Sequence, residues 1–497
     1  MSSSIPDFLA QSVRNAGSLD PRYNHFTGMA VMRGLEGNDM IFGNSGAEAI
    51  PQCFGREEYR WNSIRNATGT TSWYWQHGYD MVASANKILE YLPDDIVGNS
   101  NSMKKSRGRT LFLRAFGYNH LVENFQDAYT QGGNSKPGVP YYEVFDPTQP
   151  YRERETLEKC YQNINDDLNQ AYEDFKIYDK DGNYVRDSLN TSLKKAIDAG
   201  VILFLRARVS LCMGNWSQAI SDCQKIINYG NWSLMPETQY VAQKQVVDGK
   251  DHYFAVNSGF LDMSKNPETI WGFVYTDGTG QTQSTWLNAY ATNTQQGGAR
   301  GLNVQIDQRL YDKIATDDYR KDNFVGAAGA GEYEYADGQK RNILPYANLK
   351  FASSVGKSGG TDPKDAATNS NQNDWTVFRL SEVYLMLAEA QAQSGNESDA
   401  KATLDVLIDA RTNGTYTTDT YPAHAGLTTL QRVQLQTRIE MWGERGLEFY
   451  NNKRWNIAVD RTGSTNHWDK VPIPVSEMTM QIPELSINLN GLLEQNP

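Results

Sequence analysis

Apolar positions recur at helical spacing through much of the chain. A stripe of apolar and aromatic side chains predicts a helix over residues 72–92, which Pro93 ends. The same spacing predicts a helix over 102–125 and another over 156–175, where Thr156 is placed to cap the first turn. The residues before about position 70 are rich in Gly, Asn and Arg without such spacing, and we expect irregular structure there.

The sequence also contains an internal repeat. Residues 199–229 and 380–410 align without a gap, so that Ala, Gly and Asn recur at matching positions. Each copy has the pattern of an amphipathic helix, a Gly-Asn turn and a second helix, with small residues where the helices cross. Tetratricopeptide-like helix pairs have this pattern, because alanine allows close approach and glycine reverses the chain. We therefore predict a tetratricopeptide-like helix-pair scaffold over 72–230 and 375–460.

The segment between the two copies has a different composition. Residues 231–374 are rich in Gly, Asn, Gln, Thr and Tyr, and the run Trp-Gly-Phe-Val-Tyr at 271–275 predicts a short strand. A segment this long is either functional or disordered, and its evenly spread aromatic residues argue against disorder. The predicted fold class is therefore mainly α, with a large loop-rich insertion containing short strands. Residues 461–497 are expected to pack on the scaffold, and 1–497 to form one composite unit.

Composition and charge exclude several classes of protein. The formal net charge of −12 argues against nucleic acid as a partner, because nucleic-acid binding needs clustered Lys and Arg. An apolar run at 199–205 is stopped by Arg206 and is far shorter than the roughly 18 residues of a membrane span. The 28 Tyr, 17 Phe and 11 Trp are many for a soluble chain, so we expect some rings to be displayed on the surface.

Cysteine and histidine spacing predicts neither a metal site nor a cofactor. Cys53, Cys160, Cys212 and Cys223 form no CxxC pair, and no two histidines lie within four residues of each other. The cysteines are interpreted as free thiols that pack as small apolar groups. Cys212 and Cys223 lie on successive predicted helices, so a bond between them stays open at this point.

No catalytic motif survives inspection of its context. The run Gly-Lys-Ser-Gly-Gly at 356–360 has the spacing of a nucleophile elbow, but a loop follows it where a helix is required. Glu440, Glu444 and Glu448 recur every four residues on one predicted helix face, with several arginines nearby. A structural ladder of ion pairs accounts for them. We therefore predict no catalytic residues and a protein that is not an enzyme.

Six segments spread along most of the chain carry recognisable motifs. They are 75–89, 112–122, 378–390, 444–455, 472–477 and 495–497. In this order they resemble the SusD/RagB-like family of outer-membrane nutrient-binding lipoproteins of Bacteroidetes. One departure is the pair Asn451 and Asn452, where the family usually has Glu-Gly, and it concerns scaffold packing alone.

The resemblance implies a function and a location. Members of the family capture glycans, or peptides in the RagB branch, at the cell surface and pass them to a SusC-like TonB-dependent transporter. They face outward from the outer membrane through a lipidated N-terminal cysteine. The first cysteine here is Cys53, so the chain is expected to begin just after the anchor. Two alternatives stay open, namely peptide capture and a helical-repeat adaptor without a small ligand.

Sugar chemistry nominates two segments as the ligand site. Flat aromatic rings stack on the apolar C–H faces of sugars, while Asn, Gln, Asp and Arg bind their hydroxyl groups. Residues 61–76 and 283–296 combine these side chains, and the resemblance implies glycan platforms in the same two regions. Trp75 matches the family's helix pattern and is expected to be scaffold. The predicted ligand-binding residues are Arg65, Asn66, Trp73, Tyr74, Trp286, Asn288 and Tyr290.

Overall fold

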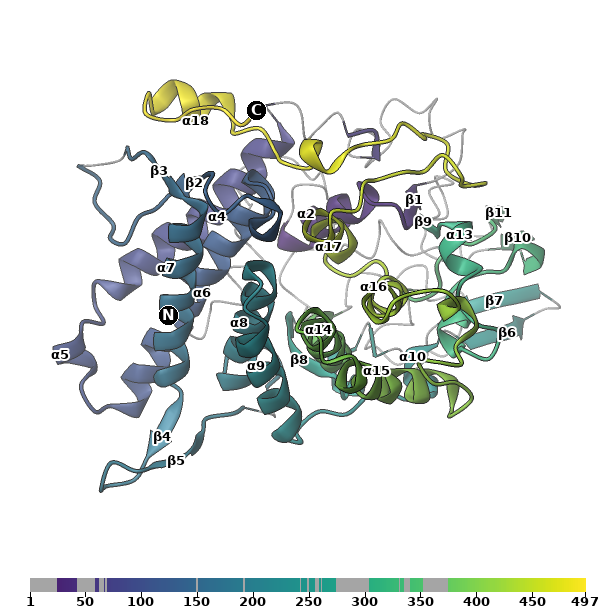
Figure 1. Cartoon of the computed structure of the whole chain (residues 1–497), viewed down its shortest axis with the longest axis horizontal. Coiled ribbons are helices and arrows are strands. Elements are labelled where there is room, and N and C mark those ends of the chain that lie inside the picture. Colours follow the sequence, from purple (N-terminus) through teal and green to yellow (C-terminus); the bar gives the residue numbers. More distant parts are fainter. Residues whose placement is uncertain are drawn as a thin grey trace.

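The structure is a computed structural model that describes most of the chain. The described residues are 25–42, 59–61, 67, 69–148, 151–190, 193–241, 243–247, 250–254, 259–260, 262–273, 304–329, 331–334, 340–351 and 374–497. Long helices dominate these residues, and the strands form small two-stranded sheets around them (Figure 1). The predicted mainly α class is confirmed. Among the described residues, no helix combines the length and apolarity needed to span a membrane.

The three helices predicted from the first third of the chain are confirmed. They are α4 (Thr70–Leu89), α6 (Asn101–Phe125) and α7 (Leu157–Glu173), with the short α5 (Asp94–Val97) between the first two. The Thr156 hydroxyl accepts a hydrogen bond from the backbone N–H of Lys159 at 3.1 Å, so this residue caps α7 as expected. Helix α6 packs against both α4 and α7, which makes it the central helix of this half.

The internal repeat forms two helix pairs, as predicted. The first copy is α8 (Ala199–Met213) and α9 (Trp216–Asn228), and the second is α14 (Leu380–Gln393) and α15 (Glu397–Thr412). Gly214 and Gly395 end the first helix of each pair with φ angles of 73° and 83°, a conformation that favours glycine. Helix α14 packs on α9, so the two copies stack side by side (Figure 1).

Two of the described strand pairs, β8–β12 and β1–β9, join segments far apart in sequence, and the others join neighbouring strands. Strand β8 (Thr269–Phe273) lies where a strand was predicted and pairs antiparallel with β12 (Trp375–Arg379). The other antiparallel pairs are β1 (Met40–Phe42) with β9 (Val304–Ile306), β2 (Pro137–Pro140) with β3 (Arg154–Thr156), β4 (Lys176–Tyr178) with β5 (Tyr184–Asp187), β6 (Gln243–Val247) with β7 (Lys250–Phe254), and β10 (Gly331–Glu334) with β11 (Lys340–Ile343).

Shorter elements complete the second half of the chain. The helices are α10 (Glu237–Tyr240), α13 (Gln308–Tyr311), α16 (Thr429–Glu440), α17 (Leu447–Trp455) and α18 (Glu484–Leu489). Single 3-10 turns are η4 (Tyr129–Gln131), η5 (Met263–Lys265), η6 (Tyr319–Asn323), η7 (Ala327–Gly329), η10 (Pro422–His424) and η11 (Val475–Glu477). The C-terminal segment contacts the scaffold, because Asn496 Nδ2 donates to the carbonyl oxygen of Phe125 at 2.8 Å.

The expectation of irregular structure before residue 70 is wrong for helix α2 (His25–Leu35). Its apolar residues from Met29 onward are buried, and so is Arg33, so no solvent-facing stripe marks it in the sequence. The turn that follows α2 is held by a residue far along the chain. Arg461 donates to the carbonyl oxygens of Leu35 at 2.7 Å, Gly37 at 3.0 Å and Tyr59 at 2.8 Å.

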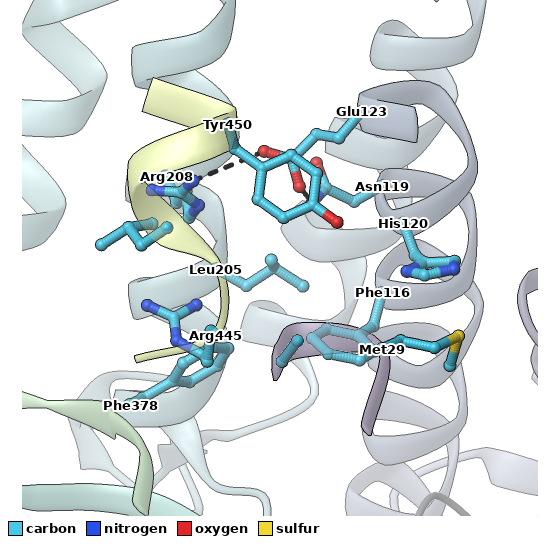
Figure 2. A pocket seen from close by; sticks show the side chains of 12 residues that line it. Met29, Phe116, Asn119, His120, Glu123, Leu205, Arg208, Phe378, Arg445 and Tyr450 are labelled. Atoms are coloured by element: carbon cyan, nitrogen blue, oxygen red, sulfur yellow. Dashed lines mark hydrogen bonds and ion pairs between the residues drawn. The ribbon is translucent and has the colours of Figure 1, made fainter. Parts of the chain in front are cut away.

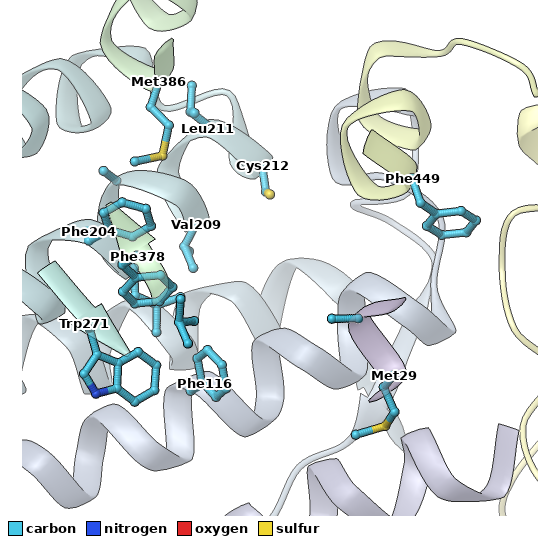
Figure 3. Packing of buried hydrophobic residues seen from close by; sticks show 14 of the residues in the cluster. Met29, Phe116, Phe204, Val209, Leu211, Cys212, Trp271, Phe378, Met386 and Phe449 are labelled. Atoms are coloured by element: carbon cyan, nitrogen blue, oxygen red, sulfur yellow. The ribbon is translucent and has the colours of Figure 1, made fainter. Parts of the chain in front are cut away.

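Much of the aromatic surplus serves the core. Trp271 of β8 meets Phe112 and Phe116 of α6 edge to face, with ring centroids 5.5 and 5.8 Å apart. Phe378 of β12 stacks on Phe204 of α8 at 4.1 Å (Figure 3). This cluster joins the small β8–β12 sheet to helices α6 and α8 of the first half of the chain. Three of the cysteines, Cys160, Cys212 and Cys223, are buried free thiols, and Cys53 lies outside the described residues.

Candidate functional site

The structure describes two of the predicted ligand-binding residues and corrects one. Tyr74 is only 1% exposed, its hydroxyl donates to the carbonyl oxygen of Met29 at 2.7 Å, and its ring stacks on His120. The prediction for Tyr74 is therefore wrong, because its ring faces helix α2. Trp73 is half-buried, and Trp75 is confirmed as scaffold. The remaining predictions lie outside the described residues: Arg65, Asn66, Trp286, Asn288 and Tyr290.

A groove of about 380 Å³ lies beside the first predicted segment, and we call it the α4 groove. Its volume falls within the range of small-molecule sites, roughly 300–1,000 Å³. Residues of helix α4, of β2 and the chain between β2 and β3, and of the C-terminal segment around α18 form its walls. The lining residues are Ser72, Trp75, Gln76, Tyr79, Asp80, Pro140, Tyr142, Tyr151, Pro483, Leu485, Ser486, Leu489, Asn490 and Leu493.

Hydrogen bonds fix the aromatic wall of the groove in place. The Tyr79 hydroxyl donates to the carbonyl oxygen of Pro140 at 2.8 Å, and its ring meets that of Tyr142 edge to face. The backbone of Tyr142 is held at both polar atoms. Its carbonyl oxygen accepts a hydrogen bond from Asn86 Nδ2 at 2.8 Å, and its N–H donates one to the Tyr118 hydroxyl at 2.6 Å. The rings are therefore held by the scaffold before any ligand arrives, which lowers the entropy cost of binding.

The opposite wall is apolar and open to solvent. Leu485 and Leu489 lie one turn apart on α18 and are 67% and 58% exposed. Asn490 Nδ2 donates to the carbonyl oxygen of Arg152 at 2.9 Å, which ties α18 to the segment that carries the half-exposed ring of Tyr151. An exposed apolar surface beside a concave site is typical of a place where a ligand or partner binds.

Polar side chains on α4 complete the groove. Gln76 and Asp80 lie one helical turn apart, so they project on the same side of α4. Asp80 is half-buried, and this burial raises its pKa to about 6. In one groove, flat rings can stack on the apolar C–H faces of a ligand. A carboxylate can accept hydrogen bonds from its hydroxyl groups, and an amide can both donate and accept them.

Two descriptions of known protein families match parts of the chain. A family described as "Starch-binding associating with outer membrane" matches residues 34–175, and the SusD family matches residues 255–497. The chain belongs to the SusD/RagB-like family. None of the curated proteins matches its sequence.

Solved structures of SusD-like proteins share the fold of this one over nearly its full length. A SusD-like carbohydrate-binding protein from Bacteroides vulgatus is 20% identical, with a TM-score of 0.72 over 99% of this chain and 96% of that chain. A SusD superfamily protein from Bacteroides thetaiotaomicron is 19% identical, with a TM-score of 0.70 over 99% of both chains. Surface glycan-binding protein A from Bacteroides thetaiotaomicron, solved with laminarihexaose, is 17% identical, with a TM-score of 0.66 over 100% and 98%.

A second cavity in this SusD-like protein is enclosed and much smaller. It measures about 40 Å³ and lies between α2, α6, α8 and the start of α17 (Figure 2). Asn119 Oδ1, Arg208 Nη2 and Arg445 Nε line it without a hydrogen-bond partner among the described residues. A buried water needs about 10–15 Å³ of such volume, so the cavity has room for a few water molecules and is too small for a sugar.

The predicted ladder of ion pairs is structural, but its geometry differs from the prediction. Helix α16 ends at Glu440 and α17 begins at Leu447, so Glu440, Glu444 and Glu448 do not share one helix face. Glu440 is fully buried and pairs with arginines from other elements, which hold its pKa well below the usual range despite burial. Its partners are Arg320 at 3.2 Å, Arg379 at 2.6 Å and Arg411 at 2.9 Å.

Glu448 has a different environment from Glu440. It accepts hydrogen bonds from the backbone N–H groups of Asn38 at 2.7 Å and Asp39 at 3.3 Å, and burial raises its pKa to about 7. None of these carboxylates lines the α4 groove. Within the described residues, no cluster of His, Cys, Asp and Glu could hold a metal ion.

Proposed function

We propose that this SusD-like protein binds a carbohydrate at the outer surface of the outer membrane and delivers it to a TonB-dependent transporter without chemical change. The observation that carries the proposal is the α4 groove, which preformed aromatic rings and polar side chains line together. Family membership supports it, since one matching family is described as starch-binding and associated with the outer membrane. A structural relative was solved with laminarihexaose.

The groove fits the physical demands of weak glycan capture. Tyr142 and Tyr151 offer ring faces, while Gln76 and Asp80 offer hydrogen bonds. A few stacked rings and hydrogen bonds give a net binding free energy of about 4–8 kcal/mol, which corresponds to mM to µM affinity. Weak binding suits a protein that must release its ligand to a partner. The predicted residues Trp286, Asn288 and Tyr290 are proposed to extend the same ligand site.

Binding to a panel of polysaccharides tests the proposal. Native gel electrophoresis through amylopectin, laminarin, xylan or mannan is expected to retard the protein in at least one gel. Calorimetry with the matching hexasaccharide then gives the affinity. Tyr151→Ala is expected to weaken binding about tenfold, because a stacked aromatic contact contributes about 1–2 kcal/mol.

Tyr184→Ala serves as the matched control. Tyr184 lies on the β4–β5 hairpin and is 50% exposed, against 51% for Tyr151, but it does not line the groove. Its replacement is expected to leave the affinity unchanged. Equal affinity of the Tyr151 variant and the wild type would remove the groove from the proposal, and the absence of retardation by every polysaccharide would overturn carbohydrate binding itself.

A second candidate function is peptide capture of the RagB type. The exposed leucines on α18, Leu485 and Leu489, favour it because aliphatic walls accommodate apolar peptide side chains as readily as sugars. A peptide-library screen separates the two proposals. Enrichment of peptides with apolar anchors, together with no retardation by polysaccharides, would favour the peptide. Binding of neither class would leave the helical-repeat adaptor.

A further inference from the structure

We infer that Asp80 selects the ligand of the α4 groove by accepting hydrogen bonds from two neighbouring hydroxyl groups of a neutral sugar. The inference rests on the proposed function and assigns the polar anchor of the groove to a single carboxylate. It is carried by the position of Asp80 in the groove wall and by its lack of a hydrogen-bond or ion-pair partner among the described residues.

Asp80 differs from three shielded aspartates on or beside other helices of the same half of the chain, α7 and α9. Asp167 and Asp174 of the α7 region each pair with an arginine of α6, both at 2.6 Å, and Asp222 pairs with an arginine of α8 at 2.7 Å. Asp80 makes no hydrogen bond or ion pair with any residue that the structure describes, although it is half-buried. A shielded carboxylate normally has a partner, so this one is placed to receive its donors from a ligand.

Asp80 is the one charged side chain among the described residues that line the groove. The other titratable groups there are the hydroxyls of Tyr79, Tyr142 and Tyr151. Arg152 stands behind the wall, with its guanidinium 5.3 Å from the centroid of the Tyr142 ring. Burial by itself raises the pKa of Asp80, with no contribution from a neighbouring charge.

The shape of the site favours a neutral sugar over an ammonium group. A carboxylate has two oxygens with about four lone-pair positions, so it can accept from two adjacent hydroxyl groups at once. The rings of Tyr142 and Tyr151 and the leucines of α18 need an apolar ligand face beside those donors, which the C–H face of a sugar ring supplies. An ammonium ligand would leave these walls without a matching surface.

This role makes the affinity depend on pH in a defined direction. The ionised carboxylate accepts hydrogen bonds, whereas the protonated one loses acceptor capacity. Because Asp80 has a pKa of about 6 in the free protein, affinity is expected to be near its maximum at about pH 7. The affinity is expected to fall about tenfold by about pH 5. Near that pH, binding is expected to release a proton, because Asp80 is mostly protonated in the free protein and ionised in the complex.

Calorimetry with laminarihexaose, maltohexaose and xylohexaose tests the inference on the full chain. Asp80→Asn is expected to weaken the best-bound hexasaccharide at least tenfold at about pH 7 and to flatten the pH profile. Asp322→Asn is the matched control, because burial also raises the pKa of this aspartate of η6 and it does not line the groove. Its affinity and pH profile are expected to match those of the wild type.

Each other outcome overturns a defined statement. If the wild type binds and the Asp80 variant binds equally well, or if wild-type affinity is independent of pH, the role of Asp80 is wrong and the proposed function stands. Tighter binding of glucosamine hexasaccharide, weakened by high salt, would replace the neutral sugar with an ammonium ligand. If no hexasaccharide and no polysaccharide of the panel binds, the proposed function fails and this inference fails with it.

Discussion

Replacing Glu440 with glutamine removes the negative charge at the centre of a buried ion network. The carboxylate touches three guanidinium groups, those of Arg320, Arg379 and Arg411, and all four side chains are fully buried or nearly so. Arg379 and Arg411 also share Glu268, at 2.9 and 2.5 Å. The network joins the turn before β8 to β12, α15, α16 and η6, so it crosses the interface between the helical repeat and the segments inserted in it.

The expected cost follows from the imbalance of charge that the substitution creates. Lys350, Arg320, Arg379 and Arg411 face Asp318, Glu268, Glu440 and Glu444, so loss of one carboxylate leaves one buried positive charge without compensation. Removing one partner of a buried pair costs about 3–5 kcal/mol. A chain of 497 residues has an unfolding entropy of about 1 kcal/mol per kelvin, so the Tm is expected to fall by about 3–5 °C.

Calorimetry and urea titration of Glu440→Gln measure this cost. Glu153→Gln is the control, because Glu153 is exposed in the loop before β3, and its Tm is expected to stay within about 1 °C of the wild type. A Tm of the Glu440 variant that equals or exceeds that of the wild type would refute the reasoning. In that case the desolvation of the ions would cancel their mutual attraction.

Three further predictions concern the ligand site, a buried lysine and a backbone crossing. Trp73→Ala and Trp286→Ala are each expected to weaken oligosaccharide binding in calorimetry while lowering the Tm by no more than a few degrees, about 1–4 °C, and unchanged affinity in both variants would remove them from the site. Burial lowers the pKa of Lys453 to about 7, so between about pH 7 and pH 10.5 the unfolded chain binds a proton that the folded chain lacks, and native stability rises with pH. Lys453→Met is therefore expected to exceed the wild type in urea stability most strongly at or below pH 7, and an advantage that grows at pH 9 would contradict this sign. Gly446→Ala places a Cβ atom 2.9 Å from a backbone carbonyl oxygen of α2, at a φ of 63°. The substitution is therefore expected to lower the free energy of unfolding in urea by more than about 2 kcal/mol. Gly395→Ala, where nothing lies within 4 Å of the added Cβ, is expected to lower it by about 1 kcal/mol.

Local pattern predicts much of the helical scaffold. Helices α4 and α7 each bury one face and expose another, so their apolar spacing is visible in the sequence. The repeat predicts its own turns, because Gly214 and Gly395 occupy positions that need a left-handed backbone. Helix α2 has no such signal, since its described residues are buried on every side and no polar face alternates with an apolar one.

The groove depends on contacts that no local pattern contains. Residue types predict that residues near position 73 lie at a binding surface, and Ser72 and Gln76 do line the α4 groove. They do not indicate that Tyr142, Tyr151 and α18 supply the other walls, because these segments lie about 70 and 410 residues farther along the chain. Tyr74 and its neighbour Trp73 point in different directions from α4. Tyr74 points toward α2, a helix that the sequence pattern does not predict.

The hydrogen bonds of Arg461 to the turn after α2 have a consequence for folding during synthesis. Arg461 lies 426 residues after Leu35, whose carbonyl oxygen it binds. At 5–20 residues per second, the ribosome adds this arginine about 20 to 90 s after it adds Leu35, the last residue of α2. During that interval the apolar surface of α2, from Met29 to Leu35, lacks its C-terminal cover. Helix α2 is therefore among the last of the described helices to gain its full cover, and until then its apolar surface is open to aggregation.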